Sequence, residues 1–231
     1  MRLVLMGTGP FAVPTFARLI ESGAHTIAAV ITRPEKPARG KIEVDLHPVR
    51  TLAKQHSLPL HAPESINSDE AHALLRELNA DLFVVCDYGQ ILKPAALELA
   101  KHGGINLHGS LLPKYRGAAP IQWAIYEGET ETGVTVIHMT PRLDGGPILE
   151  QVATPIGPDE TNVELEPRLA QLGITAVERA IVRIAAGDTA GVTQDPALVT
   201  KAPRLAKTAG AIDWTRTAKQ IHDQIRALVP W

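Results

Sequence analysis

The segment most informative about the architecture reads Gly104-Ile105-Asn106-Leu107-His108-Gly109-Ser110-Leu111-Leu112-Pro113-Lys114-Tyr115-Arg116-Gly117-Ala118-Ala119-Pro120. Its apolar start predicts a buried strand over residues 104–107, because strands covered on both faces are rich in Val, Ile and Leu. Asn106 and His108 are two residues apart, so they project to one face at the end of that strand. Open α/β proteins bind ligands at the carboxyl edge of a parallel sheet, and we expect a site there.

Similar apolar runs lie on both sides of this segment, at residues 2–6, 26–32, 82–87 and 133–139. Amphipathic segments between them predict helices over residues 14–22, 48–56, 69–78, 94–100 and 119–127. A longer helix is expected from residue 159 to about residue 186. Alternation of strands with helices predicts an α/β fold in which helices flank a parallel sheet.

The last part of the chain differs from this pattern. After Gly187 we expect short strands at residues 193–200 and 211–214, followed by a last helix at residues 217–228. This tail is too short to bury a core of its own, so it should pack on the main domain. We therefore expect a main domain at residues 1–187 and an extension at residues 188–231.

The composition excludes several functional classes. The 231 residues are 45% hydrophobic and 21% charged, with 23 basic and 25 acidic side chains. A net charge of −2 gives no overall attraction to nucleic acid, so such contacts would need a local basic patch. The one cysteine, Cys86, excludes an intramolecular disulfide, and the histidines are too scattered for a metal site. No apolar run reaches about 18 residues and no signal peptide is present, so we expect a cytoplasmic protein without membrane contact.

Three polar residues are candidates for catalysis. Asn106 can donate its amide to a developing oxyanion, and His108 can donate or accept a proton near neutral pH. A carboxylate is the missing partner. Asp144 supplies it in the loop Leu143-Asp144-Gly145-Gly146, which follows the strand at residues 133–139. We expect that loop to arrive at the same sheet edge.

Two other chemistries are disfavoured. Gly7-Thr8-Gly9-Pro10-Phe11-Ala12 follows the first strand as a dinucleotide fingerprint would, but Pro10 lacks the N–H that a phosphate needs. Thr8 and Phe11 then either border a cleft in a tight turn or contact substrate. Ser110 lies near His108, yet its neighbours lack the second glycine of the Gly-x-Ser-x-Gly nucleophile turn.

At this point the sequence resembles the folate-dependent formyltransferases. The resemblance is carried by segments along the whole chain: residues 106–113, 116–122, 133–136, 143–146, 212–214 and 225–227. It implies a Rossmann-like formyltransferase fold with a mostly parallel sheet, flanking helices and a short C-terminal extension. It also implies 10-formyltetrahydrofolate as formyl donor and a catalytic trio of Asn106, His108 and Asp144. No metal is implied.

The resemblance further implies a folate pocket on two sides of the cleft. One side is formed largely by backbone groups of the segment after the third apolar run, including Tyr88, Gln90, Ile91 and Leu92. The other side is formed by Ser110, Leu111, Leu112 and Pro113. The family often has alanine where this chain has Asp87, so local contacts there are expected to differ.

Within the family, the resemblance is greatest to the branch that formylates methionyl-tRNA. In that branch a basic loop at residues 33–41 contacts the acceptor stem, and its cations would position phosphates rather than read sequence. The predicted phosphate contacts are Arg33, Lys36, Arg39 and Lys41. Thr8 and Phe11 are the predicted contacts of the substrate end. The alternative is a solvated loop whose charges contact nothing.

Formyl transfer to initiator methionyl-tRNA is therefore the expected activity, in translation initiation and one-carbon metabolism. The runner-up is formyl transfer to a nucleotide-linked amino sugar, whose enzymes share residues 111–117 and 128–133 but generally lack the basic loop. Formyltetrahydrofolate hydrolysis with water as acceptor is less favoured. The tRNA enzymes continue into a C-terminal barrel that is absent from this sequence, so we expect a monomer that binds folate normally and tRNA weakly.

Overall fold

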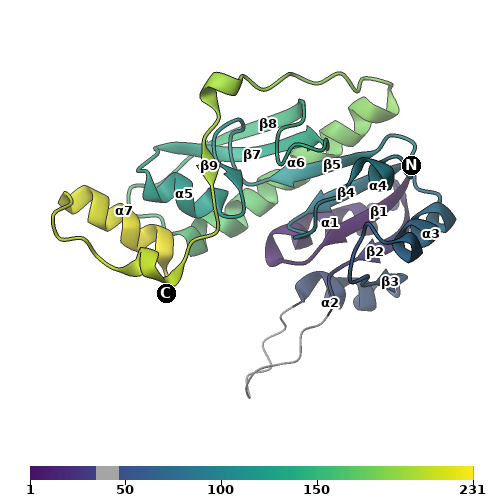
Figure 1. Ribbon diagram of the computed structural model, residues 1–231, viewed down its shortest axis with the longest axis horizontal. Coiled ribbons are helices and arrows are strands. Elements are labelled where there is room, and N and C mark those ends of the chain that lie inside the picture. The colour runs from purple at the N-terminus through teal and green to yellow at the C-terminus, as the bar shows by residue number, and fades with distance from the viewer. Residues whose placement is uncertain (35–46, 231) are drawn as a thin grey trace, which may run out of the picture.

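A computed structural model of the chain describes residues 1–34 and 47–230. Its centre is a sheet of seven strands (Figure 1). In spatial order they are β3 (Leu60–His61), β2 (Thr26–Ile31), β1 (Arg2–Gly7), β4 (Leu82–Cys86), β5 (Gly104–His108), β7 (Glu131–His138) and β8 (Ile148–Pro155). The first five run parallel, whereas β7 and β8 are antiparallel to their neighbours. The expected mostly parallel sheet is confirmed.

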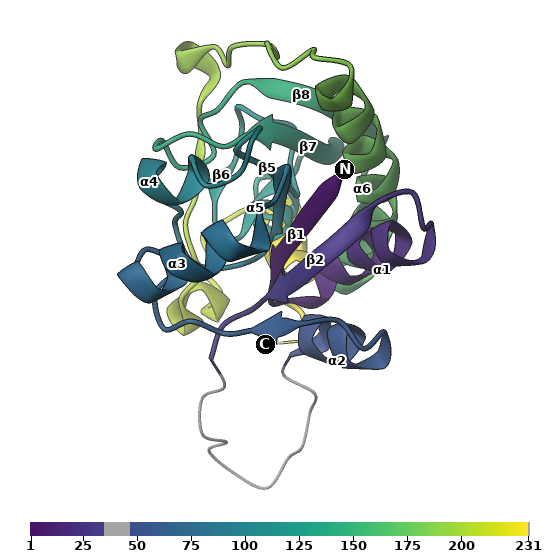
Figure 2. The same cartoon turned by 90° about the vertical axis from the view of Figure 1, so that its right-hand side faces the viewer.

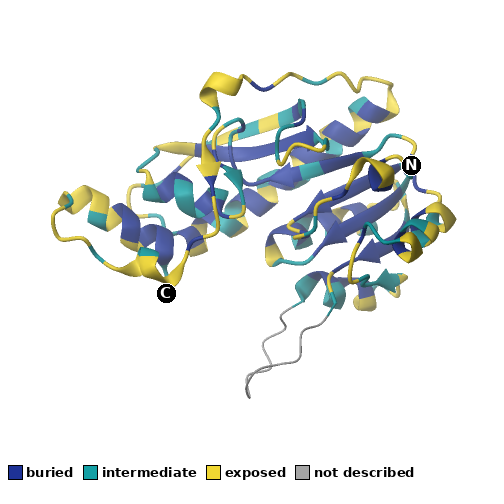
Figure 3. Ribbon diagram, viewed as in Figure 1, coloured by how far each residue is buried: buried dark blue, intermediate teal, exposed yellow. Residues whose placement is uncertain are grey.

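Helices cover both faces of the sheet (Figure 2). On one face lie α3 (Asp69–Leu78) and α4 (Pro94–Leu97), and on the other lie α1 (Val13–Glu21), α2 (Pro48–Gln55) and α6 (Asn162–Ala185). Alternate residues of a strand point to opposite faces, so β1 sends Leu3 and Leu5 into one core and Val4 and Met6 into the other. Figure 3 shows the central strands β1, β4 and β5 buried between these two layers.

Local sequence signals explain where the helices begin. Ser68 caps α3 by accepting a hydrogen bond from the backbone N–H of Ala71 at 3.2 Å, and Asn79 ends that helix in the left-handed conformation. Thr161 and Glu164 form a capping box at the start of α6. These positions agree with the helices expected from the sequence to within a few residues.

The strand predictions need several corrections. The two-residue strands β3, β6 (Arg116–Gly117) and β9 (Lys201–Ala202) were not expected, because two residues are too few to show a periodic pattern. β8 was not expected, because its burial alternates with one face partly open to solvent and so lacks a continuous apolar run. The strands expected at residues 193–200 and 211–214 are wrong. The first region forms a short 3₁₀ turn, η2 (Pro196–Leu198), in which Asp195 caps Ala197 N–H and Pro196 has no N–H for a ladder. The second follows another 3₁₀ turn, η3 (Lys207–Gly210).

The C-terminal part of the chain runs back over the main sheet. Val192 bridges to Ile148 at the start of β8, and β9 (Lys201–Ala202) then pairs in parallel with β6 (Arg116–Gly117). Finally α7 (Ala218–Leu228) packs against α5 (Pro120–Tyr126) and α6. The extension therefore contacts the main domain along its length, while the boundary expected after residue 187 stays a prediction.

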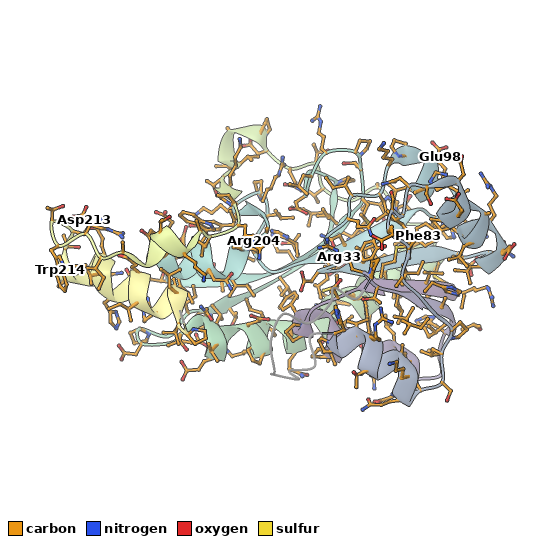
Figure 4. The ribbon with its side chains drawn as sticks, turned by 60° about the horizontal axis from the view of Figure 1, so that its bottom comes forward. Arg33, Phe83, Glu98, Arg204, Asp213 and Trp214 are labelled. Carbon is orange, nitrogen blue, oxygen red and sulfur yellow. The ribbon has the colours of Figure 1, made fainter. Side chains whose placement is uncertain are left out.

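Two surface observations complete the fold. Trp214 is 79% exposed and lies with Asp213 at the end of the molecule opposite Phe83 (Figure 4). Among residues 1–34 and 47–230, no helix combines the length and the apolarity that crossing a bilayer requires.

Candidate active site

The site expected at the carboxyl edge of the sheet lies where β1, β4 and β5 end. These strands are neighbours, with Gly7 opposite Cys86 and Val85 opposite Asn106. The strand order reverses between β1 and β4, and such a reversal opens a crevice between the loops that leave the strands. A cavity of about 480 Å³ occupies this crevice.

The predicted catalytic trio comes together in the cavity, which Asn106, His108 and Asp144 all line. Asn106 and His108 project from the end of β5, and Asp144 arrives on the loop between β7 and β8. His108 Nδ1 lies 3.9 Å from Asp144 Oδ2, and the two side chains are only 6% and 11% exposed. That separation exceeds a hydrogen bond but is close enough for an ion pair shielded from water.

The His108 ring is oriented from behind by the main chain. Its Nε2 lies 2.9 Å from the carbonyl oxygen of Tyr115. A ring N–H at Nε2 donates to that oxygen, which leaves Nδ1 for Asp144 and for a substrate. Nε2 therefore has a carbonyl acceptor, whereas Nδ1 faces the Asp144 carboxylate at a longer distance.

Asp144 is held by its loop rather than by a strand. Its backbone has φ of +47°, in the left-handed region that aspartate adopts more readily than most residues. The N–H of Gly117 donates to Asp144 Oδ2 at 2.9 Å. A main-chain N–H therefore orients the carboxylate oxygen that faces His108.

The predicted donor-binding segment follows β4 and lines the same cavity. Tyr88 buries its ring in the core beneath α3 and α4, and burial raises its pKa to about 12. The Gln90 amide is used internally, since it accepts from Ile66 N–H at 2.8 Å and donates to the Pro63 carbonyl at 3.2 Å. Ile91 is 61% exposed, whereas Leu92 is buried. Folate contacts through this segment stay a prediction.

The other predicted wall of the folate pocket does not line the cavity. Ser110 is fully buried, and its hydroxyl donates to the Lys114 carbonyl at 2.7 Å. Thr135 on β7 donates to the Ser110 carbonyl at 2.6 Å and accepts from Leu112 N–H at 3.1 Å. This turn therefore supports the loop after His108. The four residues absent from the cavity wall are Ser110, Leu111, Leu112 and Pro113.

The predicted substrate contacts are divided. Phe11 lines the cavity, whereas the Thr8 hydroxyl donates to the Tyr88 carbonyl at 3.1 Å and so ties two loops together. Arg33 is exposed, and its Nη1 lies 3.1 Å from where a Cβ on Gly89 would stand, which places the guanidinium beside a residue of the cavity wall (Figure 4). Three more predicted phosphate contacts lie outside the described residues: Lys36, Arg39 and Lys41.

Two carboxylates line the cavity wall. Glu166 was missed as a site residue, and Asp87 was expected only as part of the segment beside the folate, with no role for its carboxyl. Asp87 follows β4, and Glu166 comes from the second turn of α6. Asp87 Oδ2 occupies the space beside Gly9, where a Cβ would lie 1.8 Å from it, so only glycine permits this approach. Burial of the carboxyl raises the pKa of Asp87, and burial and then the negative charge of Asp87 raise the pKa of Glu166. One sequence feature pointed to Asp87: it is an aspartate at a position where the family that the chain resembles often has alanine.

These raised pKa values predict a pH-dependent gain in stability for Asp87→Asn. A carboxyl whose pKa is raised by folding contributes full stability below its ordinary pKa, and loses it as pH rises through the folded pKa. We therefore expect Asp87→Asn to raise Tm by about 1–3 °C at pH 8. The shift is modest because the residue as a whole is exposed, although its carboxyl lies against Gly9. The gain should disappear near pH 4.5. Scanning calorimetry with Asp159→Asn as exposed control measures it, and an equal gain at both pH values would contradict it.

Comparison with known proteins identifies the class. The profile described as formyl transferase matches residues 1–181, and the one described as formyl transferase, C-terminal domain, matches residues 204–231. The chain belongs to the formyl transferase family, as the resemblance implied, and is an enzyme of that class.

Individual relatives are more specific. Methionyl-tRNA formyltransferase of Rhodopirellula baltica is 53% identical over the whole chain, which covers 72% of that protein. The enzyme of the same name from Geobacter sulfurreducens is 42% identical, with 73% of its length covered. The N-formyltransferase from Helicobacter canadensis, solved with folinic acid and dTDP-3-aminofucose, superposes with a TM-score of 0.74 at 23% identity. That match covers 97% of this chain and 79% of the other, and it supports the fold.

Proposed function

We propose that the protein transfers the formyl group of 10-formyltetrahydrofolate to the amino group of methionyl-tRNA. The observation that carries the chemistry is the cavity in which Asn106 joins the shielded pair of His108 and Asp144. The relatives named methionyl-tRNA formyltransferase support the choice of acceptor. The substrate amine is itself the nucleophile, so no covalent enzyme intermediate is needed.

Asn106, His108 and Asp144 have different roles when the amine attacks the formyl carbon. As the tetrahedral intermediate forms, negative charge collects on the formyl oxygen, and the Asn106 amide with a protonated His108 stabilises it. Asp144 stabilises the imidazolium across the 3.9 Å separation. Asp144 also accepts the proton that the amine loses, directly or through water. Collapse of the intermediate breaks the bond to N10 of the folate. N10 takes up one proton, which balances the proton that the amine gave to Asp144, and tetrahydrofolate leaves.

The donor fits the cavity by size and by lining. We place the pterin against the segment after β4, where backbone groups and the exposed Ile91 are available. The cavity volume of about 480 Å³ lies within the usual range for cofactor sites. The described part of the chain contains no group of three or more His, Cys, Asp or Glu arranged to hold a metal ion.

The acceptor end fits a second cavity of about 590 Å³ next to the first. The two cavities share Phe11, Ala118, Gln122 and Glu166 on their walls. The second is lined mainly by apolar groups from η1 (Pro10–Ala12), α6 and the end of α7, which suit a methionyl side chain. Arg204 adds a positive charge to its wall, where a phosphate of the acceptor could lie. Arg33 retains its proposed role as phosphate contact.

The test is a competition between acceptors in a single-turnover reaction with 10-formyltetrahydrofolate. Charged initiator tRNA and a nucleotide amino sugar are offered together, and formylated products are separated by mass. We expect formyl-methionyl-tRNA as the main product, because the apolar second cavity offers little to a sugar. Formylation of the sugar alone would overturn the acceptor. Tetrahydrofolate release at the same rate without any acceptor would instead indicate a hydrolase.

The remaining expectations belong to this proposal. We infer a cytoplasmic monomer whose catalytic domain spans residues 1–187 and whose extension spans residues 188–231. Initiator methionyl-tRNA and the folate donor are its partners.

A further inference from the structure

The segment that links α6 to β9 contains one buried side chain. Residues 188–200 are exposed or half-buried with the exception of Gln194, which is 6% exposed. Polar side chains are buried when their hydrogen bonds are made, and a primary amide has two donors and one strong acceptor oxygen to satisfy. The hydrogen-bond partners of Gln194 therefore show which parts of the main domain this segment is attached to.

Gln194 is bonded on both sides of its amide. Its Oε1 accepts from Arg116, from Nε at 3.0 Å and from Nη2 at 2.6 Å. Its Nε2 donates to the carbonyls of Asp144 and Gly146, both at 2.8 Å. One side chain thus joins the loop that carries the catalytic carboxylate to the short strand β6.

The same linking segment is also hydrogen-bonded to Tyr115, the residue that orients His108. Thr200 accepts from Tyr115 N–H through its hydroxyl at 2.8 Å and from Arg116 N–H through its carbonyl at 3.0 Å. Tyr115 is the residue whose carbonyl contacts His108 Nε2. Gly117, which donates to Asp144, has φ of +132° and would place a Cβ 2.4 Å from the Ala202 carbonyl. Residues 115–117 therefore contact both members of the ion pair and are themselves held by residues 194–202.

We propose that Gln194 is a positioning residue that sets the distance between the Asp144 carboxylate and the His108 ring. It acts through the backbone of Asp144 and through Arg116, and it does not touch the cavity. This inference rests on the proposed function, in which the ion pair carries the chemistry. A shift of about 1 Å in such a pair lowers the rate by about 100-fold.

The variant that tests it is Gln194→Glu. Glutamate keeps the volume of the side chain and the acceptor oxygen for Arg116. It cannot donate to the carbonyls of Asp144 and Gly146, so the Asp144 loop loses these two hydrogen bonds. We expect kcat to fall about 100-fold while KM for the folate donor stays within threefold, because the segment proposed to contact the pterin follows β4 and Gln194 does not contact it. The control is Thr193→Ala, an exposed neighbour in the same segment, which should keep the parental kcat.

A double-mutant cycle distinguishes positioning from a general loss of structure. Gln194→Glu is measured alone and in the Asp144→Asn background, with kcat expressed per folate-binding site so that unfolded protein does not count. If Gln194 acts through Asp144, the double variant is slower than Asp144→Asn by less than threefold. An additive loss near 100-fold, or a single variant with kcat within threefold of the parent, overturns the proposal.

Failure of the Gln194 proposal and failure of the proposed function give different results. A parent enzyme that formylates only an amino sugar would refute the tRNA assignment, and the cycle would then be measured with that acceptor. Gln194→Ala serves as the second variant, because it removes the bonds to Arg116 as well. Its kcat should be no higher than that of Gln194→Glu, and a higher value would overturn the proposal.

Discussion

Asp144→Asn is expected to lower kcat for formyl transfer by about 10²–10⁴-fold, the usual contribution of a positioned acid–base group. Asparagine keeps the size of the side chain and can still accept the Gly117 N–H. It removes the negative charge that faces His108 Nδ1 at 3.9 Å and the group that receives the proton of the amine. Single-turnover formylation at saturating folate measures the loss directly.

The controls for this variant exclude a folding defect. Folate binding should match the parent and Tm should change little, because asparagine keeps the volume of the side chain and the acceptor for the Gly117 N–H. Asp159→Asn, at a carboxylate that is 89% exposed, should keep the parental kcat. A fully folded Asp144→Asn enzyme within tenfold of the parental kcat would remove Asp144 from the proposed mechanism.

Asn106→Ala is expected to lower kcat by about 10²–10³-fold, the usual cost of losing one donor to a developing oxyanion. The side chain projects from the end of β5 into the cavity beside His108. Because its donor acts on charge that appears only in the transition state, KM for the folate donor should change little. Separate kcat and KM values from steady-state kinetics give the distinction.

Asn106→Asp is the informative companion. It preserves shape but turns the donor into an acceptor that repels the oxyanion, so its kcat should be at or below that of Asn106→Ala. If either variant raised KM while leaving kcat unchanged, Asn106 would be a binding residue for the ground state rather than an oxyanion donor.

The sequence predicted the features that depend on local pattern. Continuous apolar runs located β1, β2, β4, β5 and β7, and the two-residue spacing of Asn106 and His108 placed both at one sheet edge. Asp144 was expected beside them because β7 was predicted to be one more strand ending at that edge. In fact β7 is antiparallel to β5 and its last residue, His138, lies opposite Ile105, so the loop after β7 reaches His108 from the other end of β5. The pattern failed for β8, where alternation of half-buried residues resembles many surface segments.

Contacts between distant segments could not be predicted. Gln194 reads as a loop residue until the chain brings it 50 positions back to Asp144. The pKa of Glu166 is raised by Asp87, which lies on a different element, and no spacing rule links a helix turn to that loop. The resemblance implied Ser110 as a wall of the folate pocket, and no local pattern could show that its hydroxyl donates to the Lys114 carbonyl.

The pairing of β6 with β9 has a consequence for how the enzyme is made. A ribosome synthesises the seven strands of the main sheet and the catalytic trio before residues 194–202 leave the exit tunnel, since domains form from the N-terminus onward. Until that late segment docks, residues 115–117 lack the partners that hold them against His108 and Asp144. We therefore expect full activity only after residues 194–202 have docked on residues 115–117.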